Sequence, residues 1–346
     1  MKKLDIKSMT ADEIAENLRE DGQPPFRSGQ IFRWLHQKRV GNFNEMSNLP
    51  LGLRDKCNEK YYINTLKIKK RLVSSIDGTV KYLYELNDGN TVEAVLMRYR
   101  HGTSICVSTQ AGCRMGCSFC ASAMGGFSRN LTPAEILDQI YSAQEDIGAA
   151  EKISGVVLMG IGEPLDNFEG TLRFLSLLSS PEGFGLSLRH VSLSTCGLVD
   201  KIDELARHKL GITLSVSLHA PNDNIRGRLM PIAKKWPMDG LLSACKRYFA
   251  ITGRRISFEY ALIENINDKP EHATELAAKL KGMNCHVNLI PVNAVEGSSY
   301  RASGQSSADT FVKILLGRGV NTTVRRRLGD DINAACGQLR RESVGK

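Results

Sequence analysis

Helical spacing of apolar residues dominates the first sixty positions. Thr10 and Glu13 form a capping box at the start of an amphipathic run, and Gly22 stands where that run is expected to end. Residues 28–40 again place apolar side chains at helical spacing. We therefore predict a small helical domain over residues 1–62.

A two-residue period replaces the helical one in the next segment. Apolar and polar residues alternate between residues 65 and 100, and the pairs Asp77-Gly78 and Asp88-Gly89 are turn signals. This pattern predicts a short β-meander. We assign residues 63–103 to it, as a linker between the helical domain and the remainder of the chain.

Strand-like and helical runs alternate from residue 104 to the end. Six apolar strand-like runs occur, at residues 105–108, 155–159, 190–194, 212–218, 256–262 and 286–290. The clearest helix spans residues 133–147, with Thr132 as N-cap, Glu135 as its capping-box partner and Gly148 as its end. Apolar strands joined by helices are typical of parallel sheets. We predict an α/β fold with a partial (βα)6 barrel over residues 104–346, and chemistry at the carboxyl ends of its strands.

Composition and charge narrow the class of protein. Apolar content of 42% and charged content of 24% are ordinary for a globular protein. No stretch approaches the roughly 20 apolar residues of a membrane span, and the basic start lacks the apolar run of a signal peptide. We expect a cytoplasmic protein with no membrane association. The net charge of +9 suits a polyanionic partner, although a solvated basic surface has the same composition.

Cysteine usage points to metal ligation. The chain has nine cysteines, an odd number that does not suggest a secreted disulfide framework. Cys113, Cys117 and Cys120 form a CxxxCxxC run, which supplies three ligands where a closed zinc or iron–sulfur site takes four. We predict one [4Fe–4S] cluster with one iron open to a further ligand. The spacing resembles that of radical S-adenosylmethionine (SAM) enzymes, which implies that SAM is this ligand. The alternatives are a zinc site completed from elsewhere and a coincidental surface cluster.

Polar residues follow several predicted strands of the barrel. Gly162 and Glu163 follow the second strand, Ser194 ends the third, residues 217–219 (Ser217, Leu218 and His219) end the fourth, and Asn293 follows the last. Each alone has a common structural explanation, as a turn or a satisfied buried polar group. Together at one end of one barrel, they are better explained by a shared polar ligand. Because Gly162 and Glu163 resemble the motif with which radical SAM enzymes hold the methionine amino group, the resemblance implies that this ligand is SAM.

Nearly the whole chain resembles a known family of enzymes. The RlmN/Cfr family of radical SAM RNA methyltransferases has a set of motifs in the order in which this chain carries them. Those motifs are Cys106-Val-Ser-Thr-Gln-Ala-Gly-Cys113, the three-cysteine run, Gly160-Ile-Gly-Glu-Pro-Leu-Asp-Asn167, Leu193-Ser-Thr-Cys-Gly197, Ser217-Leu-His-Ala-Pro-Asn-Asp223, Asn288-Leu-Ile-Pro-Val-Asn293 and Gly329-Asp-Asp-Ile-Asn-Ala-Ala-Cys-Gly-Gln-Leu339.

The resemblance implies a radical mechanism with two catalytic thiols. Carbon C2 of adenine is electron-poor and does not attack a SAM methyl group directly. By resemblance, Cys336 takes a methyl group from one SAM, and a radical made from a second SAM abstracts hydrogen from that methyl group. The carbon radical adds to adenine C2. Cys106 then releases the covalent adduct by forming a disulfide with Cys336, and Glu93 accepts the C2 proton. Taken alone, Cys336 would be read as a small buried residue.

Partners follow from the same resemblance. It implies 23S ribosomal RNA and transfer RNA as substrates, flavodoxin or ferredoxin as electron donor, and a monomeric enzyme. Pro164 favours RlmN-type over Cfr-type enzymes, which methylate adenine C8. Cys196 and Val292 depart from the family pattern.

Candidates for phosphate contact are the basic residues Lys67, Lys69, Lys70, Arg71, Arg98, Arg100, Lys234, Lys235, Arg254, Arg255, Arg325, Arg326 and Arg327.

Two interpretations from other classes stay open at this stage. A radical SAM enzyme acting on a peptide or small molecule would keep the cluster but would not need the Cys106 and Cys336 pair. A non-enzymatic iron–sulfur or zinc RNA-binding protein would leave Glu163 and the other polar strand ends without a role.

Overall fold

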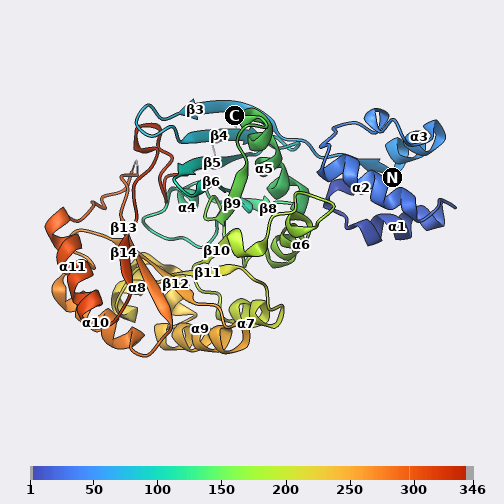
Figure 1. Ribbon diagram of the computed structural model, residues 1–346. Helices are drawn as coiled ribbons and strands as arrows, with labels where there is room; N and C mark the ends of the chain where they lie inside the picture. Colours follow the sequence, from blue (N-terminus) through green and yellow to red (C-terminus); the bar gives the residue numbers. More distant parts are fainter. Residues whose placement is uncertain (1–2, 296, 340–346) are drawn as a thin grey trace.

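The N-terminal helices form a separate lobe beside the main body. The structure is a computed structural model that describes residues 3–295 and 297–339. The lobe is drawn in blue in Figure 1 and contains α1 (Ala11–Glu20), α2 (Phe26–His36) and α3 (Leu51–Lys60). A two-stranded parallel pair, β1 (Leu4–Asp5) and β2 (Tyr61–Tyr62), joins its two ends. The predicted capping box of Thr10 and Glu13 is confirmed.

Ten strands form the main sheet. Their order is β14-β13-β12-β11-β10-β9-β6-β5-β4-β3. The strands are β3 (Lys67–Val73), β4 (Val80–Glu85), β5 (Thr91–Tyr99), β6 (Gly102–Cys106), β9 (Ile153–Leu158), β10 (Val191–Thr195), β11 (Thr213–Ser217), β12 (Ile256–Leu262), β13 (Cys285–Pro291) and β14 (Thr322–Val324). Every pair from β6 to β14 is parallel. The partial barrel is therefore confirmed, with β14 as an additional strand after the sixth βα unit.

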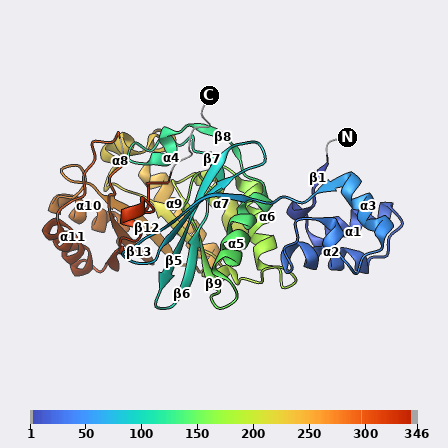
Figure 2. The ribbon, with the colours of Figure 1, turned by 90° about the horizontal axis from the view of Figure 1, so that it is seen from above.

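Helices join the parallel strands and cover the outside of the curved sheet, as Figures 1 and 2 show together. They are α5 (Pro133–Ile147), α6 (Phe168–Ser179), α7 (Val199–Arg207), α8 (Asp223–Leu229), α9 (Met238–Thr252), α10 (Pro270–Leu280) and α11 (Gln305–Gly317). The short helix α4 (Ala121–Met124) instead follows the three-cysteine run, between β7 and β8. Short 3-10 turns occur at Ile6–Ser8, Phe43–Glu45, Leu188–His190, Pro231–Lys234 and Asp330–Ile332. Helix α5 has the predicted bounds and capping box, and Gly148 follows it with φ of +74°. Within the described ranges, no helix is long and apolar enough to cross a membrane.

The meander differs from the expected linker because it continues the barrel sheet. Strand β6 pairs with β9 on one edge and with β5 on the other, so β3, β4 and β5 extend the same sheet in antiparallel fashion. Most of β5 is buried, because the sheet is covered on both faces at this point. Lys81, Val95 and Cys106 are register partners across β4, β5 and β6. Directly paired residues point to the same face, so these three side chains share one side of the sheet. The limits of the three predicted domains stay a prediction.

A small hairpin and a buried ion pair complete the framework. Strands β7 (Gln110–Gly112) and β8 (Phe127–Asn130) pair on either side of the three-cysteine run. Lys7 reaches from the helical lobe to α5, where its Nζ lies 2.9 Å from Asp138 Oδ1, and both side chains are at most 5% exposed. His36 Nδ1 is 3.0 Å from the Tyr141 hydroxyl at the same junction. The lobe is thus joined to the barrel by buried polar contacts.

Candidate active site

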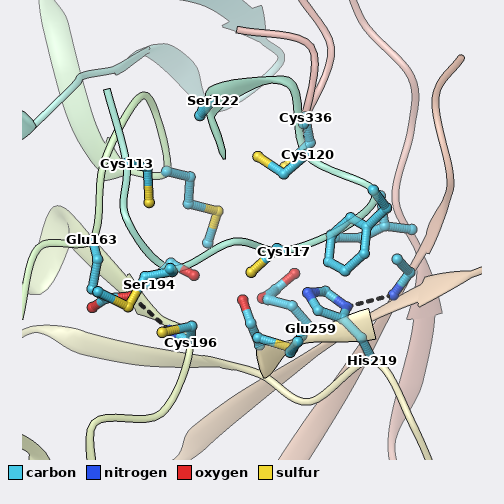
Figure 3. Close-up of a pocket in the computed structure, with 18 of the residues that line it drawn as sticks. Cys113, Cys117, Cys120, Ser122, Glu163, Ser194, Cys196, His219, Glu259 and Cys336 are labelled. Carbon is cyan, nitrogen blue, oxygen red and sulfur yellow. Dashed lines mark hydrogen bonds between the residues drawn. The ribbon is translucent and has the colours of Figure 1, made fainter. Parts of the chain in front are cut away.

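The largest set of predicted site residues meets in one cavity at the carboxyl ends of the parallel strands (Figure 3). The lining residues that the sequence had singled out are Cys113, Cys117, Cys120, Gly162, Glu163, Ser194, Ser217, His219, Asn293 and Cys336. They come from the loop after β7, from the ends of β9, β10, β11 and β13, and from the C-terminal loop. The barrel topology therefore gathers residues that are far apart in the sequence.

The three-cysteine run is positioned by a glycine and by backbone contacts. Gly112 has φ of +86°, and a Cβ there would lie 1.8 Å from Gly126 O, so no side chain fits directly before Cys113. The Cys113 N–H donates to that same carbonyl at 3.0 Å. Burial raises the pKa of the Cys113 thiol to about 12 and raises the pKa of Cys117 and Cys120 as well. A bound metal centre reverses this preference, because it stabilises the thiolate form.

These thiols suit a group larger than a single ion. Among the described residues, no three His, Cys, Asp or Glu side chains are close enough together to hold one metal ion. Cys113, Cys117 and Cys120 instead line different parts of the cavity wall (Figure 3). Separated thiols fit an iron–sulfur cluster, in which different cysteines bind different irons.

Glu163 is a buried carboxylate held by backbone donors. Its Oε1 accepts from the N–H of Leu165 at 3.0 Å and its Oε2 from the N–H of Cys196 at 2.7 Å, and only 4% of the residue is exposed. Burial raises the pKa of Glu163, and these hydrogen bonds oppose the rise. Gly162 has φ of +106°, and a Cβ there would lie 2.6 Å from Gln110 Cβ. Glycine is therefore required directly before this carboxylate, which can still accept from a cationic ligand.

Asn293 and His219 supply further polar atoms. Asn293 Nδ2 donates to the carbonyl of Cys336 at 2.9 Å, whereas its Oδ1 is buried without a hydrogen-bond partner in the described residues. A buried unpaired oxygen in a cavity wall fits a ligand that donates a hydrogen bond. His219 Nδ1 accepts from the N–H of Ala261 at 2.8 Å, which leaves the proton on Nε2. Burial lowers the pKa of His219 to about 3, so the ring is neutral.

Cys336 also lines a second cavity, on the side of the antiparallel strands. Cys106, Tyr99, Arg325, Arg326 and Arg327 are among its other lining residues. Arg325 Nη1 lies 4.0 Å from Cys336 Sγ. Burial raises the pKa of Cys106 to about 12, and Cys336 adds to that rise. The position of Cys336 between the two cavities brings it near both the three-cysteine run and Cys106.

Neither thiol is oxidised in this structure. All nine cysteines fall in the described part of the chain and are free, so the disulfide bond expected for the reaction is not a feature of the resting fold. A disulfide formed only after an adduct is released would be absent before turnover. The expected disulfide between Cys106 and Cys336 is therefore not supported by this structure.

Glu93 lies close to the second cavity without lining it. Its Oε1 is 2.9 Å from Lys81 Nζ, and its side chain is 7% exposed. Glu93 and Val95 point to the same face of β5, and Val95 pairs with Cys106. The predicted proton acceptor and the predicted resolving thiol are thus on one face of the sheet.

Two residues that line the first cavity were not predicted to do so from the sequence, and one predicted residue lies outside it. Leu218 is buried and does not line the cavity. Glu259 and Cys196 do line it. Glu259 accepts from Ser257 Oγ at 3.0 Å and from Asn288 Nδ2 at 2.8 Å. A charged residue inside an otherwise apolar strand is the signal that could have identified Glu259, whereas no local pattern distinguishes Cys196 from an inert buried thiol.

Comparisons with known proteins agree along the whole chain. A family model described as "Radical SAM superfamily" matches residues 107–277, and one described as "Ribosomal RNA large subunit methyltransferase N-terminal domain" matches residues 4–63. Proteins described as "Probable dual-specificity RNA methyltransferase RlmN" are 49% identical in Clostridium novyi, over 98% of each chain, and 51% identical in Alkaliphilus oremlandii, over 99% of each.

A solved structure is similar over the same length. The crystal structure of a radical SAM methyltransferase from Sphaerobacter thermophilus matches with a TM-score of 0.92 and 40% identity, covering 97% of this chain and 99% of that one. Both the helical lobe and the barrel are therefore shared with proteins of one family. The chain belongs to the RlmN family of radical SAM RNA methyltransferases.

Proposed function

We propose that this protein methylates C2 of a specific adenosine in 23S ribosomal RNA and of an adenosine in the anticodon loop of transfer RNA. The relatives named above are described as dual-specificity RNA methyltransferases, which supports the two RNA substrates. The observation that carries the proposal is the position of Cys336, which lines both the cavity of the three-cysteine run and the cavity that holds Cys106. This arrangement suits a reaction in which Cys336 receives a methyl group on one side and is released from the RNA adduct on the other.

Two cofactors fit the first cavity. Cys113, Cys117 and Cys120 would hold a [4Fe–4S] cluster, and Gly162, Glu163, Ser194, Ser217, His219 and Asn293 would bind SAM. When bound, the cluster supplies an electron for SAM cleavage, and SAM supplies the methyl group and the hydrogen-abstracting radical. Glu163 offers a negative charge to the methionine ammonium group, and Asn293 Oδ1 offers a free acceptor. Leu218 is left out because it does not line the cavity.

The protein's own thiols and carboxylate divide the remaining work. Cys336 carries the methyl carbon that becomes bonded to adenine C2. The adduct would return its one unpaired electron to the cluster when that is bound, and Glu93 accepts the C2 proton. The Cys106 thiolate then attacks the Cys336 sulfur. The electron pair of the carbon–sulfur bond passes to the former methyl carbon, which takes up a proton and becomes the C2 methyl group, so that a Cys106–Cys336 disulfide forms and methylated RNA is released. The neighbourhood of Cys106 and Glu93 on one sheet face supports these roles.

RNA would approach the second cavity from the side of the C-terminal basic run. Arg326 and Arg327 are exposed and line this cavity. Other basic candidates are engaged elsewhere: Arg71 pairs with Asp146, and Arg98 pairs with Glu151. Phosphate contacts by Arg326 and Arg327 would hold a flipped adenine near Cys336. We expect a monomer reduced by flavodoxin or ferredoxin.

The test is to express the chain in a host that lacks its own enzyme and to analyse nuclease digests of rRNA and tRNA by mass spectrometry against nucleoside standards. We expect 2-methyladenosine with the unaltered protein and none with Cys336→Ala. The appearance of 8-methyladenosine would support the Cfr-type alternative instead. No methylated adenosine in either RNA would refute the proposal.

A further inference from the structure

The turn between β3 and β4 is hydrogen-bonded to the Cys336 loop, residues 328–339. Two contacts run in opposite directions between these segments. The N–H of Gly329 donates to Asp77 Oδ2 of the turn at 2.9 Å. In return, Asp331 Oδ2 of the loop accepts from the N–H of Ser75 at 2.9 Å and from its Oγ at 3.1 Å. A reciprocal pair of contacts of this kind fixes both the position and the direction of the loop.

Close packing also holds the Cys336 loop against this turn. Gly329 has φ of +64°, and a Cβ there would lie 3.0 Å from Thr79 Cγ2 and 2.7 Å from Ala334 Cβ. Beyond it, Leu328, Ala334 and Leu339 pack with Val95 and other apolar residues on the sheet face. The first half of the loop is therefore seated on the antiparallel strands.

Lys81 joins this loop to the predicted proton acceptor. Its Nζ donates to the carbonyl of Asn333 at 3.1 Å and lies 2.9 Å from Glu93 Oε1. The Lys81 side chain is 12% exposed, so a largely buried cation is shared between a catalytic carboxylate and the loop. In the register of the sheet, Lys81, Val95 and Cys106 form one row across three strands. The strands thus carry the proton acceptor, the resolving thiol and the link to Cys336 on one face.

The second half of the loop is held by different contacts. Asn293 Nδ2 donates to the carbonyl of Cys336 at 2.9 Å, and the N–H of Ala121 donates to the carbonyl of Gly337 at 2.8 Å. These contacts fix Cys336 relative to the first cavity. The alignment of Cys336 with Cys106 and Glu93 depends on the other half of the loop.

We propose that the β3–β4 hairpin is a positioning device for the Cys336 loop, and that Lys81 is the positioning residue that aligns this loop with Glu93 for release of the RNA adduct. This inference rests on the proposed function for the roles of Cys336 and Glu93. The contacts between the hairpin and the Cys336 loop are a structural property and are tested separately.

Hydrogen exchange tests these contacts without any turnover. Asp331→Ala removes the exposed carboxylate that binds Ser75, and peptides covering residues 328–334 should exchange at least about tenfold faster. Asp203→Ala is the matched control, because Asp203 is a surface carboxylate that also accepts two hydrogen bonds, from Arg247. It should leave exchange of this loop unchanged. Equal exchange of the loop in both variants would overturn the role of the hairpin.

Step-resolved kinetics test Lys81. The Lys81→Met protein should keep its iron and should accept the methyl group on Cys336, but its covalent RNA adduct should decay at least about tenfold more slowly than that of the unaltered protein. Lys81→Arg retains a cation and should restore most of the rate. Normal adduct decay in Lys81→Met, or an equal loss in both variants, would overturn the role of Lys81. If the unaltered protein methylates no RNA, the proposed function fails, whereas the exchange experiment still tests the contacts between the hairpin and the Cys336 loop.

Discussion

Replacement of Glu163 by glutamine should separate SAM binding from cluster binding. The substitution keeps the shape of the side chain but removes its charge. In the structure, both carboxylate oxygens accept backbone N–H groups, from Leu165 at 3.0 Å and Cys196 at 2.7 Å. Glutamine has one acceptor oxygen, so its amide NH2 would face one of these donors. We expect the variant to lose some stability and to retain Cys113, Cys117 and Cys120 as cluster ligands.

The loss of SAM affinity follows from the loss of charge. Hydrogen bonds to charged groups contribute about 1.5–3 kcal/mol, so the dissociation constant for SAM should become roughly 10- to 150-fold larger. Calorimetric titration of SAM into anaerobically reconstituted protein measures this constant, and the iron content is determined on the same samples.

Glu259→Gln gives a direct comparison, because Glu259 is the other buried carboxylate in the cavity and is bound by side-chain donors. We expect a smaller loss of affinity in this variant. Unchanged SAM affinity in Glu163→Gln, or a larger loss in Glu259→Gln, would refute the assignment of Glu163.

Three further outcomes test other parts of the molecule. Replacing any one of Cys113, Cys117 and Cys120 by alanine should abolish iron–sulfur absorption and SAM cleavage, and an intact cluster in Cys117→Ala would contradict the ligand assignment. Cys106→Ala should still accept a methyl group on Cys336 and then accumulate a denaturant-resistant, ribonuclease-sensitive RNA adduct, whereas Cys336→Ala should form none; the reverse pattern would exchange their roles. Burial lowers the pKa of His36 to about 3 from its ordinary value of 6.5, so the unfolded chain binds the extra proton between these values and stability should fall as pH drops below 6.5. At pH 5 the free energy of unfolding should be about 2 kcal/mol lower than at pH 7 because of this residue. Urea unfolding of His36→Gln should therefore show a decrease between these pH values that is smaller by about 2 kcal/mol. An unchanged pH dependence would exclude His36 as the cause.

Local sequence was sufficient for the elements whose signals are local. The capping box of Thr132 and Glu135 and the end at Gly148 gave both limits of α5, because caps and left-handed glycines act within one turn of a helix. Six of the parallel strands, β6 and β9 to β13, were recognisable as apolar runs, and all but β6 lie between helices. The three cysteines of the CxxxCxxC run were bound to be neighbours, because only two or three residues separate them along the chain.

Tertiary structure decided the contacts between distant segments. Alternation in residues 65–100 predicts strands but does not say which edge they pair with, so the continuation of the barrel sheet through β5 and β6 was not predictable. The motif order implied that Cys106 and Cys336 act together, but only the fold places Cys336 between two cavities. The link from Lys81 to Glu93 and Asn333 had no sequence signal, because a lysine on an alternating strand is usually solvated. Packing of the C-terminal loop against the antiparallel strands buries that lysine and gives it two partners.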